Sequence, residues 1–126
     1  MTSVRPSRIA QVAIPIHDLE RAKAFYGERL GLTHLFDAPP GLSFFQCGET
    51  RLMLSRPESA EQAKASILYY YVPNARAAAA TLAADGVEMA EAAHCLARVG
   101  GKDIWLAVAK DGEGNMLGLM SEEAAG

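Results

Sequence analysis

The fold is decided by the stretch IAQVAIPIHDLERAKAFYGERLGL, residues 9–32. Its first part, Ile9–Ile16, is rich in β-branched side chains, which favour a strand. Asp18 is a candidate N-cap, and Gly31 stands where a helix-terminating glycine is expected. Between them, apolar side chains recur at helical spacing, at Leu19, Ala22, Phe25, Tyr26 and Leu30. We therefore predict a buried strand that leads directly into an amphipathic helix.

The predicted first strand carries one polar side chain among apolar ones. Val12, Ile14 and Ile16 alternate and share one face, so Gln11 and Ala13 point to the other face. Three further strands are predicted, with turns at residues 39–41 and 48–49, and they span Thr33–Phe36, Leu42–Cys47 and Arg51–Ser55. The first half of the chain therefore reads as a βαβββ unit.

A second, weaker copy of this unit follows a polar linker at residues 56–65. Its predicted elements are a strand at Ser66–Val72, a helix at Ala75–Asp85, strands at Val87–Val99, Asp103–Lys110 and Met116–Met120, and a tail at Glu122–Gly126. The helix N-cap candidates Asp18 and Asn74 lie 56 positions apart, as do Ile16 and Val72. Leu52-Met53-Leu54 and Leu117-Gly118-Leu119 correspond at an offset of 65. Such self-similarity indicates a duplication.

The predicted fold class is α+β, with one domain over residues 1–126. Two tandem βαβββ modules, about 8–55 and 66–122, are expected to form a curved mixed sheet around a cleft, with the helices outside. Each sheet then has one face covered by a helix and one face free to line a cavity.

Composition excludes several classes of partner. Half of the 126 residues are hydrophobic, 21% are charged and the net charge is −3, without a basic cluster, so we expect no nucleic acid partner. No apolar run reaches the roughly 20 residues that cross a bilayer, and the N-terminus lacks the apolar core of a signal peptide, so we expect no membrane partner. The two cysteines, Cys47 and Cys95, make no disulfide framework, and we expect a cytoplasmic protein.

The two halves together resemble a known superfamily. The residue pairs and triplets DL (18–19), AFY (24–26) and LGL (30–32) are similar to the first module of the vicinal oxygen chelate superfamily, which holds glyoxalase I, extradiol dioxygenases and bleomycin-resistance proteins. The late stretch DGEGNML (111–117) resembles its Asp-Pro-Asp-Gly-Asn turn and last strand, with departures at Gly112 and Glu113. The resemblance covers roughly residues 8–122 and implies the same fold.

The resemblance also implies where metal ligands would lie. Metal-dependent members take four ligands, each His, Gln or Glu, from the first and last strands of the two modules, and these positions fall on Gln11, Met53, Ile67 and Gly118. A catalytic divalent ion needs about three protein N or O donors. Gln11 offers one neutral oxygen, Met53 a soft sulfur, and the other two positions no donor. We therefore expect no cofactor, with a divalent metal as the less favoured case.

Several side chains are candidates for binding a small molecule. Gln11 can exchange hydrogen bonds with a ligand, and Arg51, Tyr69 and Tyr71 share the cavity-facing parity of Met53. An arginine beside phenols can hold a carboxylate or phenolate. The alternative is that Arg51 and Gln11 are solvated and the tyrosines belong to the core.

Two further candidates, His94 and Trp105, come from the resemblance, which implies a similar His and a Trp before the last hairpin. His94 is the best catalytic candidate, as a general acid or base, and is otherwise a core histidine. Trp105 is otherwise a packing residue.

The preferred hypothesis is a glyoxalase/bleomycin-resistance-like protein that binds a small organic ligand without metal in the cleft between modules. One alternative is a metal-dependent lyase, isomerase or dioxygenase with relocated ligands, for which Gln11, His94 and Glu122 are the candidates. A second is a non-catalytic structural or interaction module. Whether a reaction is catalysed stays open. The resemblance implies a homodimer, which would also cover strand edges.

Overall fold

The computed structural model of the protein describes residues 4–125. The first three residues of the N-terminal segment, and Gly126 at the end of the expected tail, lie outside this range. The chain divides into two compact units, residues 1–64 (unit 1) and 65–126 (unit 2). This division falls within the predicted linker, and each unit is described by itself.

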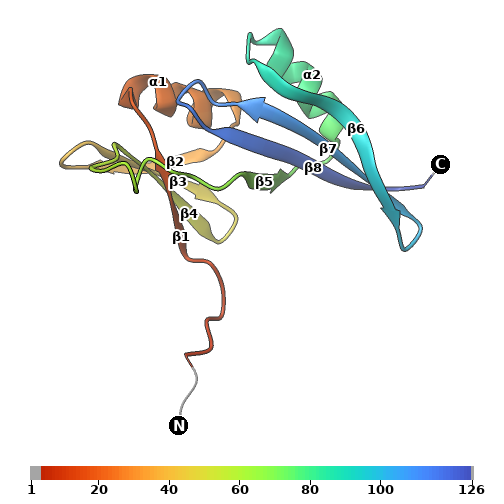
Figure 1. Ribbon diagram of the computed structural model, residues 1–126, viewed down its shortest axis with the longest axis horizontal. Coiled ribbons are helices and arrows are strands. Elements are labelled where there is room, and N and C mark those ends of the chain that lie inside the picture. The colour runs from red at the N-terminus through yellow and green to blue at the C-terminus, as the bar shows by residue number, and fades with distance from the viewer. Residues whose placement is uncertain (1–3, 126) are drawn as a thin grey trace. The chain divides into compact units, whose positions relative to one another are not determined.

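Unit 1 is a four-stranded mixed sheet with one helical segment on one face (Figure 1). The strand order is β1-β4-β3-β2, with β1 parallel to β4 and the other pairs antiparallel. Its elements are β1 (Gln11–Pro15), α1 (Leu19–Lys23), the π-helical η1 (Ala24–Arg29), β2 (Thr33–Ala38), β3 (Leu42–Cys47) and β4 (Thr50–Ser55).

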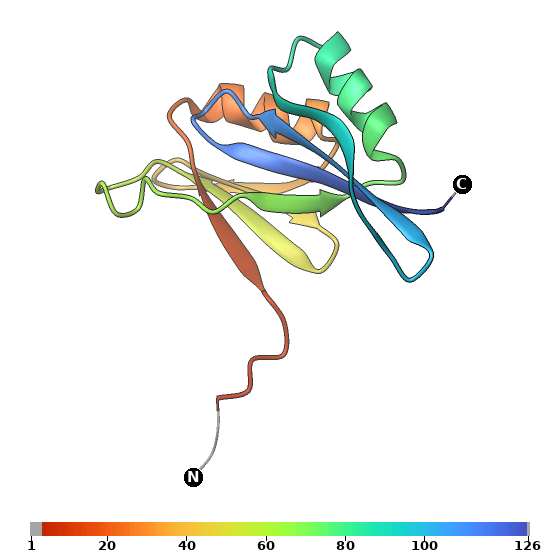
Figure 2. The ribbon, with the colours of Figure 1, turned by 45° about the vertical axis from the view of Figure 1, so that its right-hand side comes forward.

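Unit 2 repeats this topology, with strand order β5-β8-β7-β6 and β5 parallel to β8 (Figure 2). Its elements are β5 (Leu68–Tyr71), α2 (Ala75–Ala84), β6 (Met89–Val99), β7 (Lys102–Lys110) and β8 (Met116–Ala124). The predicted α+β class and the two βαβββ modules are confirmed.

The duplication extends to register and capping. Ala13 pairs with Met53 in unit 1, and Tyr69, 56 positions after Ala13, pairs with Gly118, 65 positions after Met53. The carboxylate of Asp18 accepts from the amide of Arg21 at 2.9 Å, and the side chain of Asn74 accepts from that of Ala77 at 2.9 Å. The sequence offsets therefore mark structurally equivalent positions.

In each unit the helix covers one sheet face, and the other face is called here the open face. In unit 1, Phe25 and Tyr26 of η1 are buried on the side of the sheet that carries Ile14, Leu52 and Leu54. In unit 2, Ala75, Ala79 and Leu82 of α2 are buried on the side that carries Leu117 and Leu119. This division places Gln11 and Ala13 of β1, and Tyr69 and Tyr71 of β5, on the open faces, as the alternation of side chains along a strand predicts.

Several predicted bounds and one helix type differ from the structure. The first helix is α-helical only to Lys23 and continues as a π-helix before Gly31 ends it with a φ of 78°. Strand β1 starts at Gln11 and leaves Ile9 67% exposed. Residues Glu122–Ala124, predicted as the start of a tail, belong to β8, because β7 begins at Lys102 and supplies partners as far as Ala124. No helix in the described part of the chain is long and apolar enough to cross a membrane.

Candidate functional site

The open face of unit 1 carries an oriented arginine. Gln11 and Arg51 are register partners on β1 and β4, and Arg51 Nε donates to Gln11 Oε1 at 2.8 Å. The Arg51 guanidinium carbon lies 5.4 Å from the centroid of the Phe44 ring, within cation–π range. Phe44 in turn stacks on Phe36, with centroids 4.5 Å apart. Backbone pairing thus places a guanidinium, an amide and two rings on one face.

This arrangement leaves the terminal nitrogens of Arg51 available. The amide oxygen holds Nε, the Phe44 ring lies against the guanidinium carbon, and neither terminal nitrogen has a hydrogen-bond or ion-pair partner among residues 4–125. Arg51 is exposed, so these donors reach solvent. A planar fork of this kind matches the two oxygens of a carboxylate.

A hollow of about 450 Å³ lies at the other end of the same face. Along β4, alternate residues Arg51, Met53 and Ser55 share the open face, and the last two line the hollow. Its other lining residues are Pro40, Gly41, Leu42, Arg56, Pro57, Glu58 and Gln62. Gln11 Nε2 lies 3.8 Å from the sulfur of Met53. The structure therefore brings together the three unit 1 candidates, Gln11, Arg51 and Met53.

The open face of unit 2 is aromatic and is shaped by a glycine. Tyr69 and Gly118 are register partners, and a Cβ added to Gly118 would lie 2.2 Å from Tyr69 Cδ2. The ring of Tyr69 therefore occupies the space that any side chain at position 118 would need. Tyr69 is 52% exposed, so it forms a surface platform, contrary to the core alternative.

Tyr71 lies on the same face and is already engaged. Its hydroxyl donates to the carboxylate of Glu122, and this bond, followed by the negative charge of Glu122, raises the pKa of the Tyr71 phenol. His94 is also on this face, opposite Leu106, and its Nδ1 lies 2.9 Å from the carbonyl oxygen of Ala92. That contact favours the tautomer with the proton on Nδ1, which leaves Nε2 as an acceptor.

Trp105 lies on the helix-covered face instead. It pairs with Ser121 of β8, and the guanidinium carbon of Arg76 from α2 lies 4.1 Å from its ring centroid. The alternation of Ile104, Leu106 and Val108 already places residue 105 on the opposite side. Trp105 and His94 are on adjacent strands but on opposite faces, which favours the packing alternative for Trp105.

The residues at the four inherited positions do not fit a divalent metal ion. Gln11 Oε1, the one hard donor among them, already accepts from Arg51. Ile67 precedes β5 and has no donor, and Gly118 is covered by the Tyr69 ring. No group of three or more His, Cys, Asp or Glu side chains in residues 4–125 could hold an ion. The relocated candidate Glu122 accepts from Tyr71.

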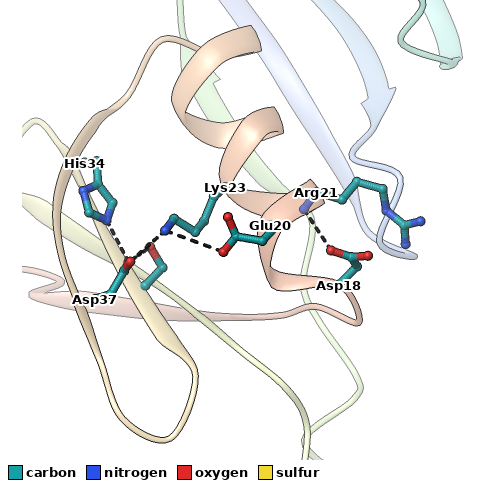
Figure 3. Close-up of polar contacts among 7 residues, drawn as sticks. Asp18, Glu20, Arg21, Lys23, His34 and Asp37 are labelled. Carbon is teal, nitrogen blue, oxygen red and sulfur yellow. Dashed lines mark hydrogen bonds and ion pairs between the residues drawn. The ribbon is translucent and has the colours of Figure 1, made fainter.

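Sequence reasoning missed two groups of residues. Phe36 and Phe44 were read only as strand residues, although the alternation of β3 places Phe44 beside Met53 on the open face. His34 is not among the sequence candidates, and the structure places it in a polar cluster with Lys23, Asp37 and Ser43 on the helix side of unit 1 (Figure 3). A β-bulge in β2 creates that cluster, and the sequence contains no clear signal for the bulge.

Comparisons with known proteins agree with this architecture. The family model for the Glyoxalase/Bleomycin resistance protein/Dioxygenase superfamily matches residues 8–119. No curated protein matches the chain by sequence.

Solved structures with this fold include a lactoylglutathione lyase from Agrobacterium tumefaciens, with 23% identity, a TM-score of 0.71 and coverage of 92% of this chain and 94% of that one. An antibiotic-binding protein from Streptomyces sp. CB03234 has 23% identity, a TM-score of 0.70 and coverage of 96% and 100%. A superfamily member from Sphaerobacter thermophilus has 20% identity, a TM-score of 0.73 and coverage of 93% and 98%. At these identities the likeness shows the fold alone.

Proposed function

The chain belongs to the Glyoxalase/Bleomycin resistance protein/Dioxygenase superfamily, and on that premise we propose that it binds a small aromatic carboxylate without a metal ion. The ligand would lie on the open face of unit 1, with its carboxylate on Arg51 and its apolar body toward Met53. The superfamily includes both enzymes and binding proteins, so the site itself must decide between them.

The observation that carries this proposal is the state of Arg51. Its Nε is held by Gln11 Oε1 at 2.8 Å, and its two terminal nitrogens have no partner within residues 4–125. A positioned guanidinium loses less conformational freedom on binding than a free one, and its charged donors strengthen each hydrogen bond. A carboxylate is therefore the ligand group that this geometry serves best.

The apolar surroundings support an aromatic body. Phe36 is 44% exposed and extends the ring surface of Phe44. Met53, at the edge of the 450 Å³ hollow, supplies an adaptable thioether contact. Specific small-molecule sites commonly join such apolar walls to a few polar groups.

The donor chemistry supports binding without metal. Metal-assisted lyase, isomerase or dioxygenase chemistry would need the carboxylate or imidazole donors that the four inherited positions lack. The solved relatives include a protein named as a lyase and one named as antibiotic-binding, and the second kind of role fits this donor set better. His94 stays the candidate for any acid–base step.

The proposal includes a cytoplasmic homodimer. Each sheet of the described chain ends in strands that pair on one side only, β1 and β2 in unit 1 and β5 and β6 in unit 2. Pairing with a second copy would cover such edges. Cys47 and Cys95 are both free thiols, which suits a reducing compartment.

The decisive experiment is a calorimetric titration with benzoate and, as its uncharged counterpart, benzamide. We expect benzoate to bind more tightly, Arg51→Ala to weaken benzoate at least about tenfold, and Gln11→Ala to weaken it severalfold, since bonds to charged groups contribute about 1.5–3 kcal/mol. Arg29→Ala, which removes an exposed cation from η1, is the matched control and should bind normally. Equal binding by Arg51→Ala would refute the site.

The metal-free part of the proposal is tested separately. Elemental analysis of protein purified without chelators should find well below one transition metal per chain. Stoichiometric metal that is lost on Gln11→Ala or His94→Ala would favour the enzymatic alternative.

A further inference from the structure

The helix side of unit 1 carries a polar cluster that the proposed function does not use (Figure 3). Residues three apart on a regular strand face opposite sides, but the bulge between His34 and Phe36 brings His34 and Asp37 to the same side. There Asp37 Oδ1 accepts from Ser43 Oγ at 2.7 Å and lies 2.8 Å from His34 Nε2, and Asp37 Oδ2 accepts from Lys23 Nζ at 2.7 Å.

This arrangement fixes the role of each nitrogen of His34. The bonds from Lys23, Ser43 and His34 hold the pKa of the Asp37 carboxyl well below its usual range. An ionised carboxylate can only accept, so His34 Nε2 carries the proton that it donates to Asp37. In the neutral imidazole, Nδ1 is then an acceptor, and it has no partner among the described residues.

A hollow of about 490 Å³ adjoins the cluster, and His34 is one of its lining residues. Its apolar part is formed by Ala24, Gly27, Leu32 and Phe45, and its polar rim by Glu20, Lys23 and Glu28. Gly27 lies in the π-helical η1, and a Cβ there would be 3.1 Å from Phe45 Cε2. The absence of a side chain at position 27 therefore leaves both Phe45 and the hollow undisturbed.

The charges around this hollow favour a cation. Lys23 is the one cationic side chain in the lining, and its ammonium is already bonded to Asp37 and lies 3.8 Å from Glu20. Glu28 is exposed and has no ion-pair partner within residues 4–125. The hollow therefore combines a free acceptor with uncompensated negative charge, and it offers no free cation to an anionic ligand.

We propose that this hollow is a second ligand site, which binds a small organic ammonium ion. An N–H of the ammonium donates to His34 Nδ1, its charge lies beside Glu28, and its apolar body rests against the Phe45 and Gly27 wall. This site prefers a cation, whereas the open face of unit 1 prefers an anion, and it lies on the helix side of the same sheet. The two sites can therefore be separated by experiment.

The test is an NMR titration of the full chain with benzylammonium, benzyl alcohol and benzoate, read at the Gly27 amide. We expect benzylammonium to bind with a dissociation constant on the order of 1 mM, which corresponds to about −4 kcal/mol. Benzyl alcohol and benzoate should move the Gly27 signal at least about tenfold less at equal concentration, because they lack the charge or carry the wrong one.

Two variants test the assigned contacts. Glu28→Gln should weaken benzylammonium about threefold and, because this side chain is exposed, should leave the fold unchanged. His34→Phe should remove most of the benzylammonium binding that remains in Glu28→Gln. Glu61→Gln, an exposed carboxylate outside the lining, is the control and should match the unchanged protein.

Normal affinity in Glu28→Gln, or equal binding of benzyl alcohol at Gly27, would overturn the proposal. Benzoate binding at Arg51 is measured in its own calorimetric titration, with Arg51→Ala as the test variant, so failure of either site leaves the other testable.

Discussion

The two units share one backbone plan but distribute side-chain volume over their open faces in opposite ways. In unit 1 the small Ala13 on β1 faces the long Met53 on β4, and in unit 2 the large Tyr69 on β5 faces Gly118 on β8. Each equivalent pair fills the same patch of sheet from a different strand. The duplication therefore preserves register and topology, while the chemistry of each face is free to change.

The two open faces also differ in whether their polar donors are already engaged. In unit 1 the guanidinium of Arg51 is oriented by Gln11 and keeps its terminal donors free. In unit 2 the phenol of Tyr71 already donates to Glu122. An anion is therefore expected to bind to the unit 1 face, where a charged donor is open, and to be repelled by the carboxylate on the unit 2 face.

The helices are tied to their sheets by different means. In unit 1, Lys23 reaches Asp37 on the edge strand β2. In unit 2, Arg76 lies over Trp105 and pairs with Glu123, while Ser121 Oγ accepts from the Ala75 amide at 2.9 Å. Both ties use one cation from a helix of the unit, and the tie in unit 1 lies beside a hollow.

The largest expected effect comes from adding a side chain at Gly118, where unit 2 pairs the large Tyr69 with a residue that has none. Gly118→Ala puts a Cβ 2.2 Å from Tyr69 Cδ2, so the ring must move or the strands must separate. We expect the free energy of unfolding to fall by about 1–3 kcal/mol, the usual cost of overpacking. Chemical denaturation measures this change.

A second substitution distinguishes the ring from other causes. Tyr69→Ala in the Gly118→Ala background should recover most of the lost stability, because the clash is with that ring. Met53→Ala at the equivalent position of unit 1 removes atoms without a clash and should cost less. If the double variant stays as unstable as Gly118→Ala alone, the glycine is needed for another reason.

A smaller effect is expected from the tie in unit 1, and it should depend on pH. The pKa of Asp37 is lowered in the folded protein, chiefly by the hydrogen bond from Lys23, so its contribution to stability is present above about pH 4 and is lost as the pH falls below that. Asp37→Asn should lower the melting temperature at pH 6, and the difference from the unchanged protein should shrink toward pH 3. A difference that stays constant over this range would mean that the charge of Asp37 does not stabilise the unit.

Local sequence patterns were sufficient to predict the architecture. The caps at Asp18 and Asn74 and the glycine after the first helix are short-range signals, and each is confirmed. The boundaries failed where the cause was non-local. The extension of β8 to Ala124 depends on partners offered by β7, and the change to π-helix at Ala24 occurs within a segment of ordinary helical composition.

Predicting the candidate sites required knowledge of the strand register, whereas predicting the architecture did not. Gln11, Arg51 and Met53 are neighbours because β1 and β4 are adjacent, and the resemblance implies a site shared by the first and last strands of a module. His94 and Trp105 are candidates on adjacent strands, and only the register shows that they lie on opposite faces of the sheet. The His34 and Asp37 pair depends on a bulge, which shifts face assignment by one residue and is not visible in alternation alone.

The smallest expected effect concerns the phenol that distinguishes the unit 2 face. The hydrogen bond to Glu122 raises the pKa of Tyr71, so the phenol stays protonated above the usual value of about 10, and the bond is lost only as the pH rises through the raised value. Glu122→Gln removes the charge and should shift one tyrosine to earlier ionisation in a titration followed by tyrosinate absorbance. Tyr71→Phe should delete that late step, and Tyr69→Phe should leave it in place, because Tyr71 is the tyrosine within residues 4–125 that bonds to Glu122. If the late step persisted in Tyr71→Phe, the Tyr71 phenol would not be held by Glu122. Tyr71 could then accept a ligand as freely as Arg51 does, and the contrast between the two faces would disappear.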